Sequence, residues 1–548
     1  MEHVWFRQYE PGVPAEIDTH AYDSIVDFLV SASASRPEQT ALSCLGSELS
    51  YAELDVLSRR FASYLRNVEK LGTGERIAIM LPNLLHYPVA LFGALRAGLT
   101  IVNLNPNYTE REVAFHLQDS GARVLLVCDQ SLGAVPKTNG AAPCKVIVAS
   151  VQEMAAFRAL AADAATADRG APCATEPATG RSFIDALALG GLSRYEDLLI
   201  TPDTVAFLQY TGGTTGNQKA ALLTHRNIIA NVQQQAHWFK ADLSAPDGCV
   251  VTILPIYHIM GLTGNCLFAV AQARKNVLVP NARDLMHFVD EFRVHRFAFL
   301  VGVNTLFNAL LDFEPFRALD SSCLKVTCGA GAAVPPSVAR RWHELTGCSL
   351  TGAYGLTEAS PAVCIMPRHA TGRAGSVGVP LPSTDVILID ADGNEMPAGT
   401  SGEIAVKGPQ VMSGYWNRPD ETRDVFTKTG FLRTGDIGVI DPDGFVTIID
   451  RKKDLVLVSG FNVYPNEVEA VIAAHSGVCE CACIGVPDEK TGEALKVFVV
   501  ARDRDLTGAS LQQYCREFLT GYKVPRQFEF RDTLPKSPVG KILRRALR

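Results

Sequence analysis

The sequence predicts an α/β protein with a large N-terminal domain, which includes a β-rich subdomain, and a small α+β C-terminal domain. At 548 residues the chain exceeds what a single hydrophobic core usually organises, so more than one domain is expected. Helix-like and strand-like patterns alternate through most of the chain, and this pattern changes near residue 375 and again near residue 450. The predicted domains are therefore residues 1–449 and 450–548.

The first alternating stretch covers residues 50–130. SYAELDVLSRRFASYLRNV has helical spacing, with Ser50 as the cap and Glu53 three residues later, and ERIAIMLPN is typical of a buried strand. LHYPVALFGALRAGL predicts a helix, IVNLN a strand, TEREVAFHLQDSG a capped helix and ARVLLVCD a strand. This alternation predicts a largely parallel sheet covered by helices.

The later segments complete the predicted layout. Residues 150–182 are rich in Ala and then in Pro, Gly and Thr, so we expect a surface excursion. The α/β pattern resumes at TVAFLQY and ends near residue 330. Residues 375–450 hold short strands between Gly, Pro and Asp turns, which predicts the β-rich subdomain. The predicted C-terminal elements are a helix after Tyr464-Pro465, strands near 481–486 and 495–501, a helix near 511–519 and a strand near 527–531.

Composition excludes several classes of function. A net charge of −7 does not favour nucleic-acid binding, which needs a concentrated basic face. Residues 451–548 nevertheless hold 16 Lys and Arg against 12 Asp and Glu, so this end is positive. The fourteen cysteines show no dense disulfide spacing, and CECACIGV lacks partner ligands for a metal site. With neither a signal peptide nor a membrane-spanning stretch apparent, we expect a cytoplasmic protein.

A glycine- and threonine-rich loop carries the first chemical signal. In TVAFLQY-TGGTTGNQKA-ALLTHRNII it follows an apolar strand and precedes a helix that begins near Thr224. Glycines let backbone N–H groups converge on an anion, threonines add hydroxyl donors, and Lys219 adds positive charge. The loop suits a polyphosphate but is not a Walker A motif, because Ala220 stands where that motif has Ser or Thr.

The loop resembles the phosphate loop of the acyl-adenylate-forming superfamily, which includes acyl-CoA synthetases, luciferases and adenylation domains. Four more segments occur in the family's order: LPIYHIMG, TGAYGLTEASP, LRTGDIGVIDPDGFVTIIDRKKDLVLVSGFNVYPNEVE and LPKSPVGKILRR. The resemblance covers essentially the whole chain. NPNYTEREVAFHLQDSGA, VGVNTLFNALL and SGFNVYPNEVE most closely resemble bacterial long-chain fatty acyl-CoA synthetases.

The resemblance implies an ATP and AMP site. A carboxylate attacks the α-phosphorus of ATP, so the site must neutralise negative charge and orient the nucleophile. Asp436 is expected to accept hydrogen bonds from both ribose hydroxyls, with Arg451 supporting the sugar and Tyr354 against adenine. The predicted nucleotide-binding residues are Thr211, Gly212, Gly213, Thr214, Thr215, Gly216, Lys219, Gly329, Ala330, Gly331, Gly352, Ala353, Tyr354, Gly355, Asp436 and Arg451.

The same resemblance assigns four catalytic residues. Thr357 is expected at the α-phosphate, and Glu358 is expected to bind Mg²⁺ together with Thr215, since hard oxygen ligands suit this cation. His258 is expected near the carboxylate and the thiol path, although its exact role stays open. Lys541 is expected to stabilise the charge on the attacked phosphate, which requires its segment to reach over the site of the large domain.

Two half-reactions imply two arrangements around one acyl-adenylate. The family rotates its small C-terminal domain between them, so this domain is expected to be mobile, with the hinge at Asp450. After rotation, Ser459, Gly460 and Phe461 are expected to border the channel for the pantetheine arm of CoA. The positive charge of this domain is consistent with CoA phosphates, and a solvated basic surface explains it equally well.

The implied reaction converts a fatty acid through acyl-AMP into acyl-CoA, with ATP and CoA as substrates and with AMP and pyrophosphate released. A medium-chain or aryl-CoA ligase, and an acyl-AMP ligase serving a carrier protein, stay open. A non-catalytic adenylate sensor would be expected to lack Lys541 or Glu358, and both are present. A structural membrane-surface protein would need an amphipathic anchor, and none is apparent. Transient contact with the inner face of the membrane is compatible with an insoluble acid, and a homodimer stays open.

Overall fold

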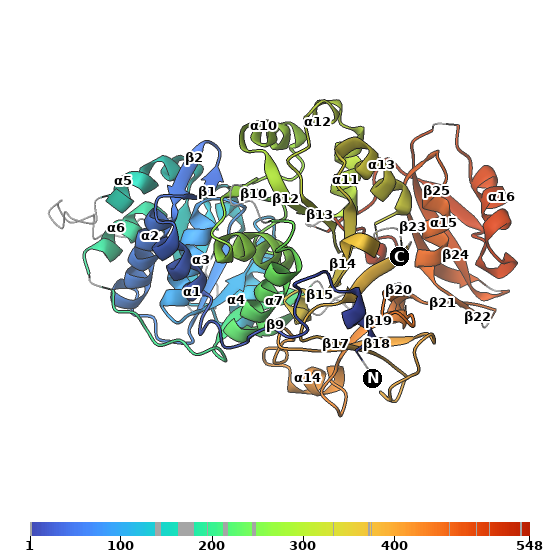
Figure 1. Ribbon diagram of the computed structural model, residues 1–548, viewed down its shortest axis with the longest axis horizontal. Helices are drawn as coiled ribbons and strands as arrows, with labels where there is room; N and C mark the ends of the chain where they lie inside the picture. The colour runs from blue at the N-terminus through green and yellow to red at the C-terminus, as the bar shows by residue number, and fades with distance from the viewer. Residues whose placement is uncertain are drawn as a thin grey trace.

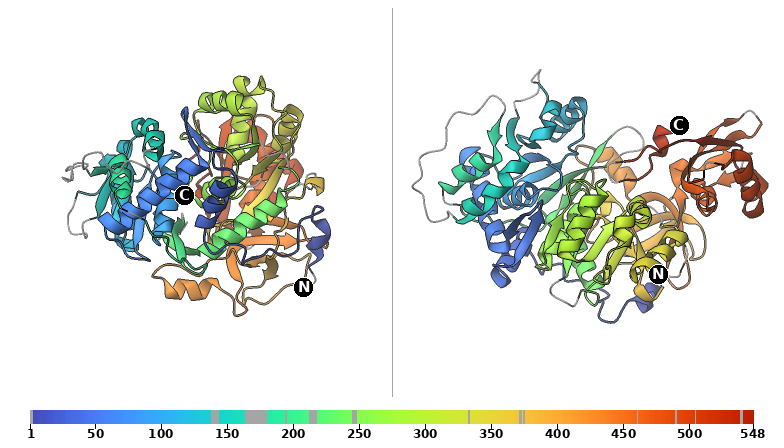
Figure 2. Two further views of the ribbon diagram at one scale, coloured as in Figure 1. Left: turned by 60° about the vertical axis from the view of Figure 1, so that its left-hand side comes forward. Right: turned by 90° about the horizontal axis from the view of Figure 1, so that it is seen from above.

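The computed structural model has two sheets in its larger part and a third at the C-terminal end (Figure 1). The N-terminal elements lie at one end, the β-rich segment lies below the centre, and the C-terminal elements form a separate lobe (Figures 1 and 2). The described residues are 3–137, 144–162, 180–193, 195–211, 218–243, 248–331, 334–370, 373, 375–459, 461–488, 490–503, 505–537 and 540–548.

The first sheet comes from the alternating N-terminal segment and ends in the hairpin of the phosphate loop. Its strands pair in parallel except for the last two, β8 and β9, which form an antiparallel hairpin. In spatial order the strands are β7 (Arg181–Ser182), β6 (Lys145–Ala149), β5 (Val124–Cys128), β3 (Arg76–Met80), β4 (Thr100–Asn103), β8 (Val205–Thr211) and β9 (Lys219–Thr224).

The second sheet changes from parallel to antiparallel along its length. Strands β11 to β14 pair in parallel, whereas β14 to β20 and the edge strands beyond them pair antiparallel. The predicted β-rich subdomain is thus a continuation of the α/β sheet. In spatial order the strands are β17 (Asp385–Ile389), β18 (Gly402–Lys407), β19 (Leu432–Ile440), β20 (Val446–Arg451), β16 (Ser376–Pro380), β15 (Ala362–Ile365), β14 (Leu350–Gly355), β13 (Val326–Gly329), β12 (Phe297–Gly302), β10 (Cys249–Thr252), β11 (Asn276–Leu278), β1 (Thr40–Cys44) and β2 (Ser47–Ser50).

Helices pack against these sheets and supply much of two large apolar cores. The predicted caps form: Ser50 with Glu53, and Thr109 with Glu112, each make a reciprocal capping box. Helix α7 begins directly after Thr224, as predicted. The helices of the larger part are α1 (Val26–Ser35), α2 (Tyr51–Ser63), α3 (His86–Arg96), α4 (Glu110–Ser120), α5 (Phe157–Ala162), α6 (Phe183–Gly191), α7 (His225–Trp238), α8 (Ile259–Gly261), α9 (Phe268–Ala271), α10 (Leu285–His295), α11 (Asn304–Asp312), α12 (Glu314–Arg317), α13 (Pro336–Thr346) and α14 (Pro419–Val425).

The C-terminal elements form an α+β unit with apolar clusters of its own. Strand β24 lies between β21 and β23, and β25 pairs with β24 in parallel. The helix predicted after Tyr464-Pro465 and the strands and helix that follow it are all present. The elements are β21 (Val456–Val458), β22 (Phe461–Val463), α15 (Pro465–Ala473), β23 (Val478–Asp488), β24 (Gly492–Ala501), α16 (Gly508–Phe518) and β25 (Gln527–Phe530).

Two expectations from the sequence need correction. The segment 150–182 is not purely a surface excursion, because Met154, Phe157 and Ala161 are buried in the first core. Their apolar side chains fill space over α2 and α6, which a local pattern does not reveal. The short strands β9, β21 and β22 were also not predicted, since each has six residues or fewer and depends on pairing with a neighbour.

None of the helices within the described ranges combines the length and the apolar composition that crossing a membrane requires.

Candidate active site

A buried cluster forms where the parallel and antiparallel halves of the second sheet meet. Asp436 on β19 lies directly opposite Arg451 at the end of β20, so the two side chains project from one face. Arg451 Nε is 3.1 Å from Asp436 Oδ1, and the Tyr354 hydroxyl donates to Asp436 Oδ2 over 2.7 Å. Burial, followed by the charge of Asp436, raises the pKa of Tyr354, which keeps its hydroxyl as a donor. Each carboxylate oxygen retains a lone pair that can accept a ribose hydroxyl.

A row of glycines lies beside this cluster at the carboxyl ends of three parallel strands. Gly302, Gly329 and Gly352 are register partners across β12, β13 and β14. A Cβ at Gly329 would lie 2.3 Å from Val334 Cγ2, so only glycine fits there. Ala330 and Gly331 continue from the row, and Gly331 has a φ of +79°. The glycines of the row therefore allow neighbouring segments to pack closely against these strands, and Gly331 has no atom nearer than 3.7 Å to the position of a Cβ. The neighbouring predicted residues Ala353 and Gly355 are on β14 with Tyr354.

The phosphate side of the site is only partly described. Gly212, Gly213, Thr214, Thr215 and Gly216 lie outside the described residues.

The two ends of this loop are fixed by the β8–β9 hairpin. Thr211 pairs with Lys219, and the Thr211 hydroxyl donates to the Lys219 carbonyl over 3.4 Å. Lys219 Nζ lies 5.2 Å from the ring centroid of Tyr415, whose hydroxyl donates to Glu358 Oε1 over 2.8 Å. A cation, an aromatic donor and a carboxylate thus converge from three segments. Thr357 precedes Glu358 in the same short 3-10 turn.

Glu358 fits a single-carboxylate site for Mg²⁺. Mg²⁺ in nucleotide enzymes usually takes one or two protein carboxylates and completes its shell with phosphate oxygens and water. In the part of the chain that the structure describes, no group of three acidic, His or Cys residues could form a cage of its own. The half-buried carboxylate of Glu358 retains lone pairs beside the one that accepts from Tyr415.

His258 caps the short helix α8, where its Nδ1 accepts from the Met260 N–H over 3.3 Å. The neutral ring therefore carries its proton on Nε2. Burial, and then the charge of Lys541, lowers the pKa of His258 to about 4. The ring is neutral at physiological pH and presents an N–H donor rather than a charge.

Lys541 belongs to the C-terminal unit, and its charge acts on His258 of the main body. The residue is exposed, yet desolvation of its ammonium group by the surrounding protein, followed by the charge of Arg451, lowers the pKa of Lys541 to about 8. Asp436 acts in the opposite direction and raises this pKa. The charges of Arg451 and Asp436 thus act on Lys541, and the charge of Lys541 acts on His258.

Asp450, the predicted hinge residue, is fully buried at the penultimate position of β20. Its carboxylate accepts from the backbone N–H groups of Arg451 and Asn466, at 2.7 and 2.8 Å. Arg544 Nη1 lies 3.2 Å from Asp450 Oδ1, and the same guanidinium binds Glu469 at 2.7 Å. Burial raises the pKa of Asp450, and Arg544 opposes this rise. Arg544 thus ties the segment that carries Lys541 to the predicted hinge residue.

The predicted CoA loop is not brought to this cluster. Ser459 follows β21 and has a φ of +51°, and Phe461 begins β22, the edge strand of the C-terminal sheet. Phe461 is 57% exposed and stacks on Tyr522 with ring centroids 4.8 Å apart. Gly460 lies outside the described residues.

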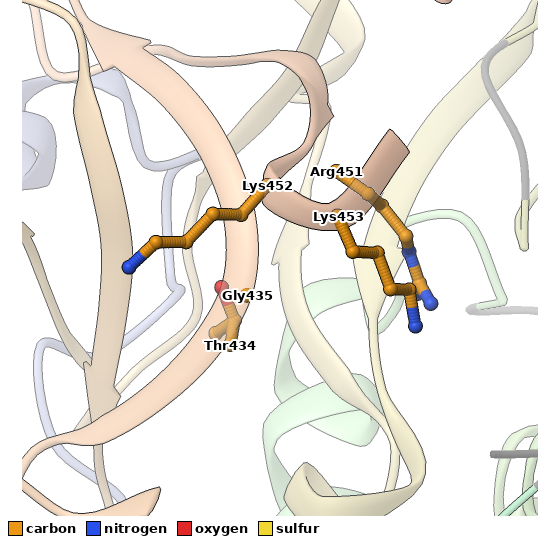
Figure 3. Close-up of a pocket in the computed structure, with 5 residues that line it drawn as sticks. All are labelled: Thr434, Gly435, Arg451, Lys452 and Lys453. Atoms are coloured by element: carbon orange, nitrogen blue, oxygen red, sulfur yellow. The ribbon is translucent and has the colours of Figure 1, made fainter. Parts of the chain in front are cut away.

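A cavity of about 290 Å³ adjoins the ribose cluster. Arg451 and Lys453 extend along one side of it, and Lys452 points away from them (Figure 3). Lys452 Nζ lies 3.2 Å from Glu403 Oε2, which accounts for its direction. Burial, followed by the charge of Arg451, lowers the pKa of Lys453. The cavity wall is therefore positive beside Asp436, and its lining residues are Thr434, Gly435, Arg451, Lys452 and Lys453.

Three residues of the site were missed by sequence reasoning. Tyr415 lies in an unremarked Gly- and Pro-containing segment, and Arg544 lies inside the quoted LPKSPVGKILRR segment, where its basic type alone indicated no partner. Asn83 is buried, donates to the Leu254 carbonyl over 3.0 Å and accepts from the Ile256 N–H over 2.9 Å. It fixes the strand end that leads to His258. An Asn after the apolar run ERIAIMLP was the available signal.

Comparison with known proteins indicates the family of this chain. The family described as AMP-binding enzyme matches residues 29–416, and the AMP-binding enzyme C-terminal domain matches residues 467–541. A long-chain-fatty-acid–CoA ligase of Escherichia coli O6:H1 is 46% identical, over 100% of this chain and 98% of its own length. The ligase of the same description from Bacillus subtilis is 33% identical over 99% and 97%. The crystal structure of ATP-bound MatB from Rhodopseudomonas palustris has a TM-score of 0.82 and 28% identity, over 95% and 98% of the two chains.

Proposed function

Because this chain belongs to the AMP-binding enzyme family and is an ATP-dependent ligase that activates fatty acids to acyl-CoA, we propose that the cluster around Asp436 and Lys541 is its active site in the adenylate-forming arrangement. One observation carries this proposal. The segment that carries Lys541 meets the main body, where Thr305 Oγ1 donates to the Gly540 carbonyl over 3.3 Å, and the charge of Asp436 of the main body acts on Lys541. A lysine near a C-terminal end would otherwise be an ordinary solvated cation.

The nucleotide binds first through groups that the fold holds in place. Asp436 accepts the ribose hydroxyls, while Tyr354 and Arg451 fix both of its oxygens. Adenine lies along the backbone of Gly329, Ala330 and Gly331. Lys219 and the loop from Thr211 hold the β- and γ-phosphates, and Thr357 lies at the α-phosphate. Mg²⁺, when bound at Glu358, supplies positive charge to the phosphate oxygens.

Acid activation then depends on two donors with opposite properties. His258 is neutral, so its Nε2–H can orient the acyl carboxylate without drawing charge from the phosphates. Lys541 is charged below pH 8 and stabilises the negative charge that develops as the carboxylate oxygen attacks the α-phosphorus. The new bond is the mixed anhydride of acyl-AMP, and pyrophosphate leaves.

Thioester formation needs the same adenylate to be reached by CoA. We assign residues 1–449 to a large domain and 450–548 to a small domain that rotates at Asp450. Rotation removes Lys541 and brings Ser459, Gly460 and Phe461 to the thiol path, which explains why this loop lies away from the cluster here. The thiol sulfur attacks the acyl carbonyl and AMP leaves.

A long-chain fatty acid is the proposed preferred substrate. Pyrophosphate release measured with ATP, CoA and acids of graded length tests this assignment. We expect kcat/KM to rise towards acids of palmitate length and to be low for aryl acids. A maximum at medium-chain or aryl acids would contradict the long-chain assignment, and adenylation without transfer to CoA would favour an acyl-AMP ligase.

Location and assembly are part of the proposal. The described cysteines are free thiols, which suits a reducing cytoplasm. A long-chain acid partitions into bilayers, so the enzyme should contact the inner face of the membrane transiently, and vesicle flotation checks this. A homodimer stays a prediction that light scattering tests.

A further inference from the structure

Helix α11 presents a polar stripe to the C-terminal unit. Thr305 and Asp312 are seven residues apart on this helix, which is about two turns, so they lie on one face. The opposite face carries Leu306, Phe307 and Leu310, which are buried in the second core. The stripe is therefore anchored rigidly to the main body.

The first end of this stripe meets the hairpin that carries Lys541. Thr305 Oγ1 donates to the carbonyl of Gly540 over 3.3 Å. Gly540 has a φ of +80°, and a Cβ there would lie 2.8 Å from Thr305 Oγ1 and 3.2 Å from Val303 Cγ2. The glycine before the catalytic lysine is thus explained by its close approach to α11 as well as by its backbone conformation.

Hydrogen bonds between Ser537 and Lys541 hold the two ends of this hairpin together, so the position of the hairpin on α11 determines where the lysine lies. The Ser537 N–H donates to the Lys541 carbonyl over 2.7 Å, and the Lys541 N–H donates to Ser537 Oγ over 3.1 Å. Ile542 packs in a cluster with Phe498 and Leu534, which fixes the hairpin to the C-terminal sheet.

The second end of the stripe carries charge. Asp312 Oδ2 lies 3.6 Å from Arg502 Nη2, and Arg341 from α13 shares the carboxylate at its other oxygen. Such an exposed pair contributes little energy alone. The Asp312–Arg502 pair lies at the far end of the same helix, however. A second contact at that distance opposes rotation of the C-terminal unit about the Thr305 contact.

We propose that Thr305 is a positioning residue: its hydrogen bond to the Gly540 carbonyl, which we call the latch, seats the Lys541 hairpin on α11 and thereby selects the adenylate-forming arrangement. Thr305 acts through Gly540 and does not touch the reacting atoms. The inference rests on the proposed role of Lys541. It goes beyond that role by naming the contact that must break before thioester formation begins.

The first test compares Thr305→Val, which keeps the shape and removes the donor, with Thr305→Ser, which keeps the hydroxyl. Adenylation is followed by pyrophosphate release from ATP and palmitate, and thioesterification is followed with supplied palmitoyl-AMP and CoA. We expect Thr305→Val to slow adenylation about three- to tenfold, the effect of one neutral hydrogen bond, and to leave thioesterification at or above the wild-type rate. Thr305→Ser should restore adenylation.

Lys541→Ala is assayed in parallel to separate two kinds of failure. If Lys541→Ala abolishes adenylation but Thr305→Val does not slow it, the latch is wrong and the proposed function stands. If Lys541→Ala retains adenylation, the proposed function fails and the latch fails with it. Equal slowing of both half-reactions in Thr305→Val would also overturn the inference, since that indicates a general structural defect.

A pair of glycine variants gives a second, independent test. Gly540→Ala and Gly492→Ala impose the same left-handed strain, because the two φ angles are +80° and +78°. Only Gly540 faces α11, since the nearest atom to a Cβ at Gly492 is the Leu457 carbonyl oxygen at 3.9 Å. We expect Gly540→Ala to lose adenylation selectively and Gly492→Ala to retain it. Equal losses in the two variants would overturn the latch.

Discussion

The two halves of the site are held in different ways. Asp436 is positioned by strand register, is 5% exposed and has both carboxylate oxygens engaged by Tyr354 and Arg451. Lys541 is exposed on a hairpin that accepts one neutral hydrogen bond from Thr305, and elsewhere in the C-terminal unit Arg502 makes a half-exposed ion pair with Asp312.

This difference separates a fixed function from a movable one. Buried groups with satisfied hydrogen bonds are costly to displace, whereas exposed polar contacts exchange readily with water. Asp436 and Tyr354, which both belong to the large domain, can therefore keep their geometry through both half-reactions, while Lys541 can leave. The rotation that we propose requires the C-terminal unit to move as a rigid body, and the contacts of Arg544 with Asp450 and Glu469 would supply that rigidity.

The largest expected effect concerns that rigidity. Arg544→Ala leaves the carboxylates of Asp450 and Glu469 without their buried cation, and loss of one partner of a buried pair costs about 3–5 kcal/mol. We expect the C-terminal unit to unfold earlier than the main body in thermal denaturation and both half-reactions to fall. Arg516→Ala is the control, since Arg516 lies on the exposed face of α16. Unchanged stability in Arg544→Ala would mean that the unit does not depend on this cluster.

The next effect concerns the fixed half. Asp436→Ala removes the ribose acceptor and should lower kcat/KM for ATP. The expected loss of transition-state stabilisation is about 2–4 kcal/mol if both hydroxyl bonds are lost from a buried site. The wild-type enzyme should discriminate against 2′-deoxy-ATP and 3′-deoxy-ATP, and the variant should not. Unchanged ATP saturation kinetics would show that Asp436 does not bind the sugar.

A smaller effect is expected from pH. The pKa of Lys541 is lowered to about 8, so the lysine is charged at pH 7 and loses its proton as pH rises through 8. Adenylation should fall by about tenfold for each further pH unit. His258, with a pKa of about 4, stays neutral throughout this range.

Stopped-flow measurement of adenylation between pH 6.5 and 9.5 tests this dependence, in buffers whose ionic strength is kept constant at about 0.1 M. Lys541→Arg is the matched control, because arginine stays protonated, and its profile should be flat even if its rate is low. A decline that persists in Lys541→Arg would assign the titration to another group.

Local signals in the sequence were sufficient for most of the fold. The capping boxes at Ser50 and Thr109 and the alternation of strands and helices predicted the elements of the first sheet. The burial of Met154 and Phe157 could not be predicted in the same way. It depends on contacts with helices far along the chain, whereas their own segment shows no sustained apolar period.

The site shows the same contrast between what local sequence signals predict and what depends on long-range contacts. The resemblance to the acyl-adenylate-forming superfamily predicted Asp436, Arg451, Tyr354 and Lys541 as site residues, because each stands in one of the segments that carry the resemblance. The pairing itself is long-range: Tyr354 and Asp436 are 82 positions apart, and Thr305 and Gly540 are 235 apart. Partners that join such segments have no local pattern, which is why Tyr415, Asn83 and Arg544 emerged only from the fold.

The rates of the two half-reactions in purified Lys541→Ala test the central claim most directly. Adenylation, followed by pyrophosphate release from ATP and palmitate, should fall by about 10²–10³ because a preorganised charged donor is lost. Thioester formation from supplied palmitoyl-AMP and CoA should continue at near the wild-type rate, since the rotated domain has already removed Lys541 from the phosphate. Retained adenylation would contradict the catalytic role of Lys541, and equal losses in both reactions would contradict a rotating domain and favour a single static site.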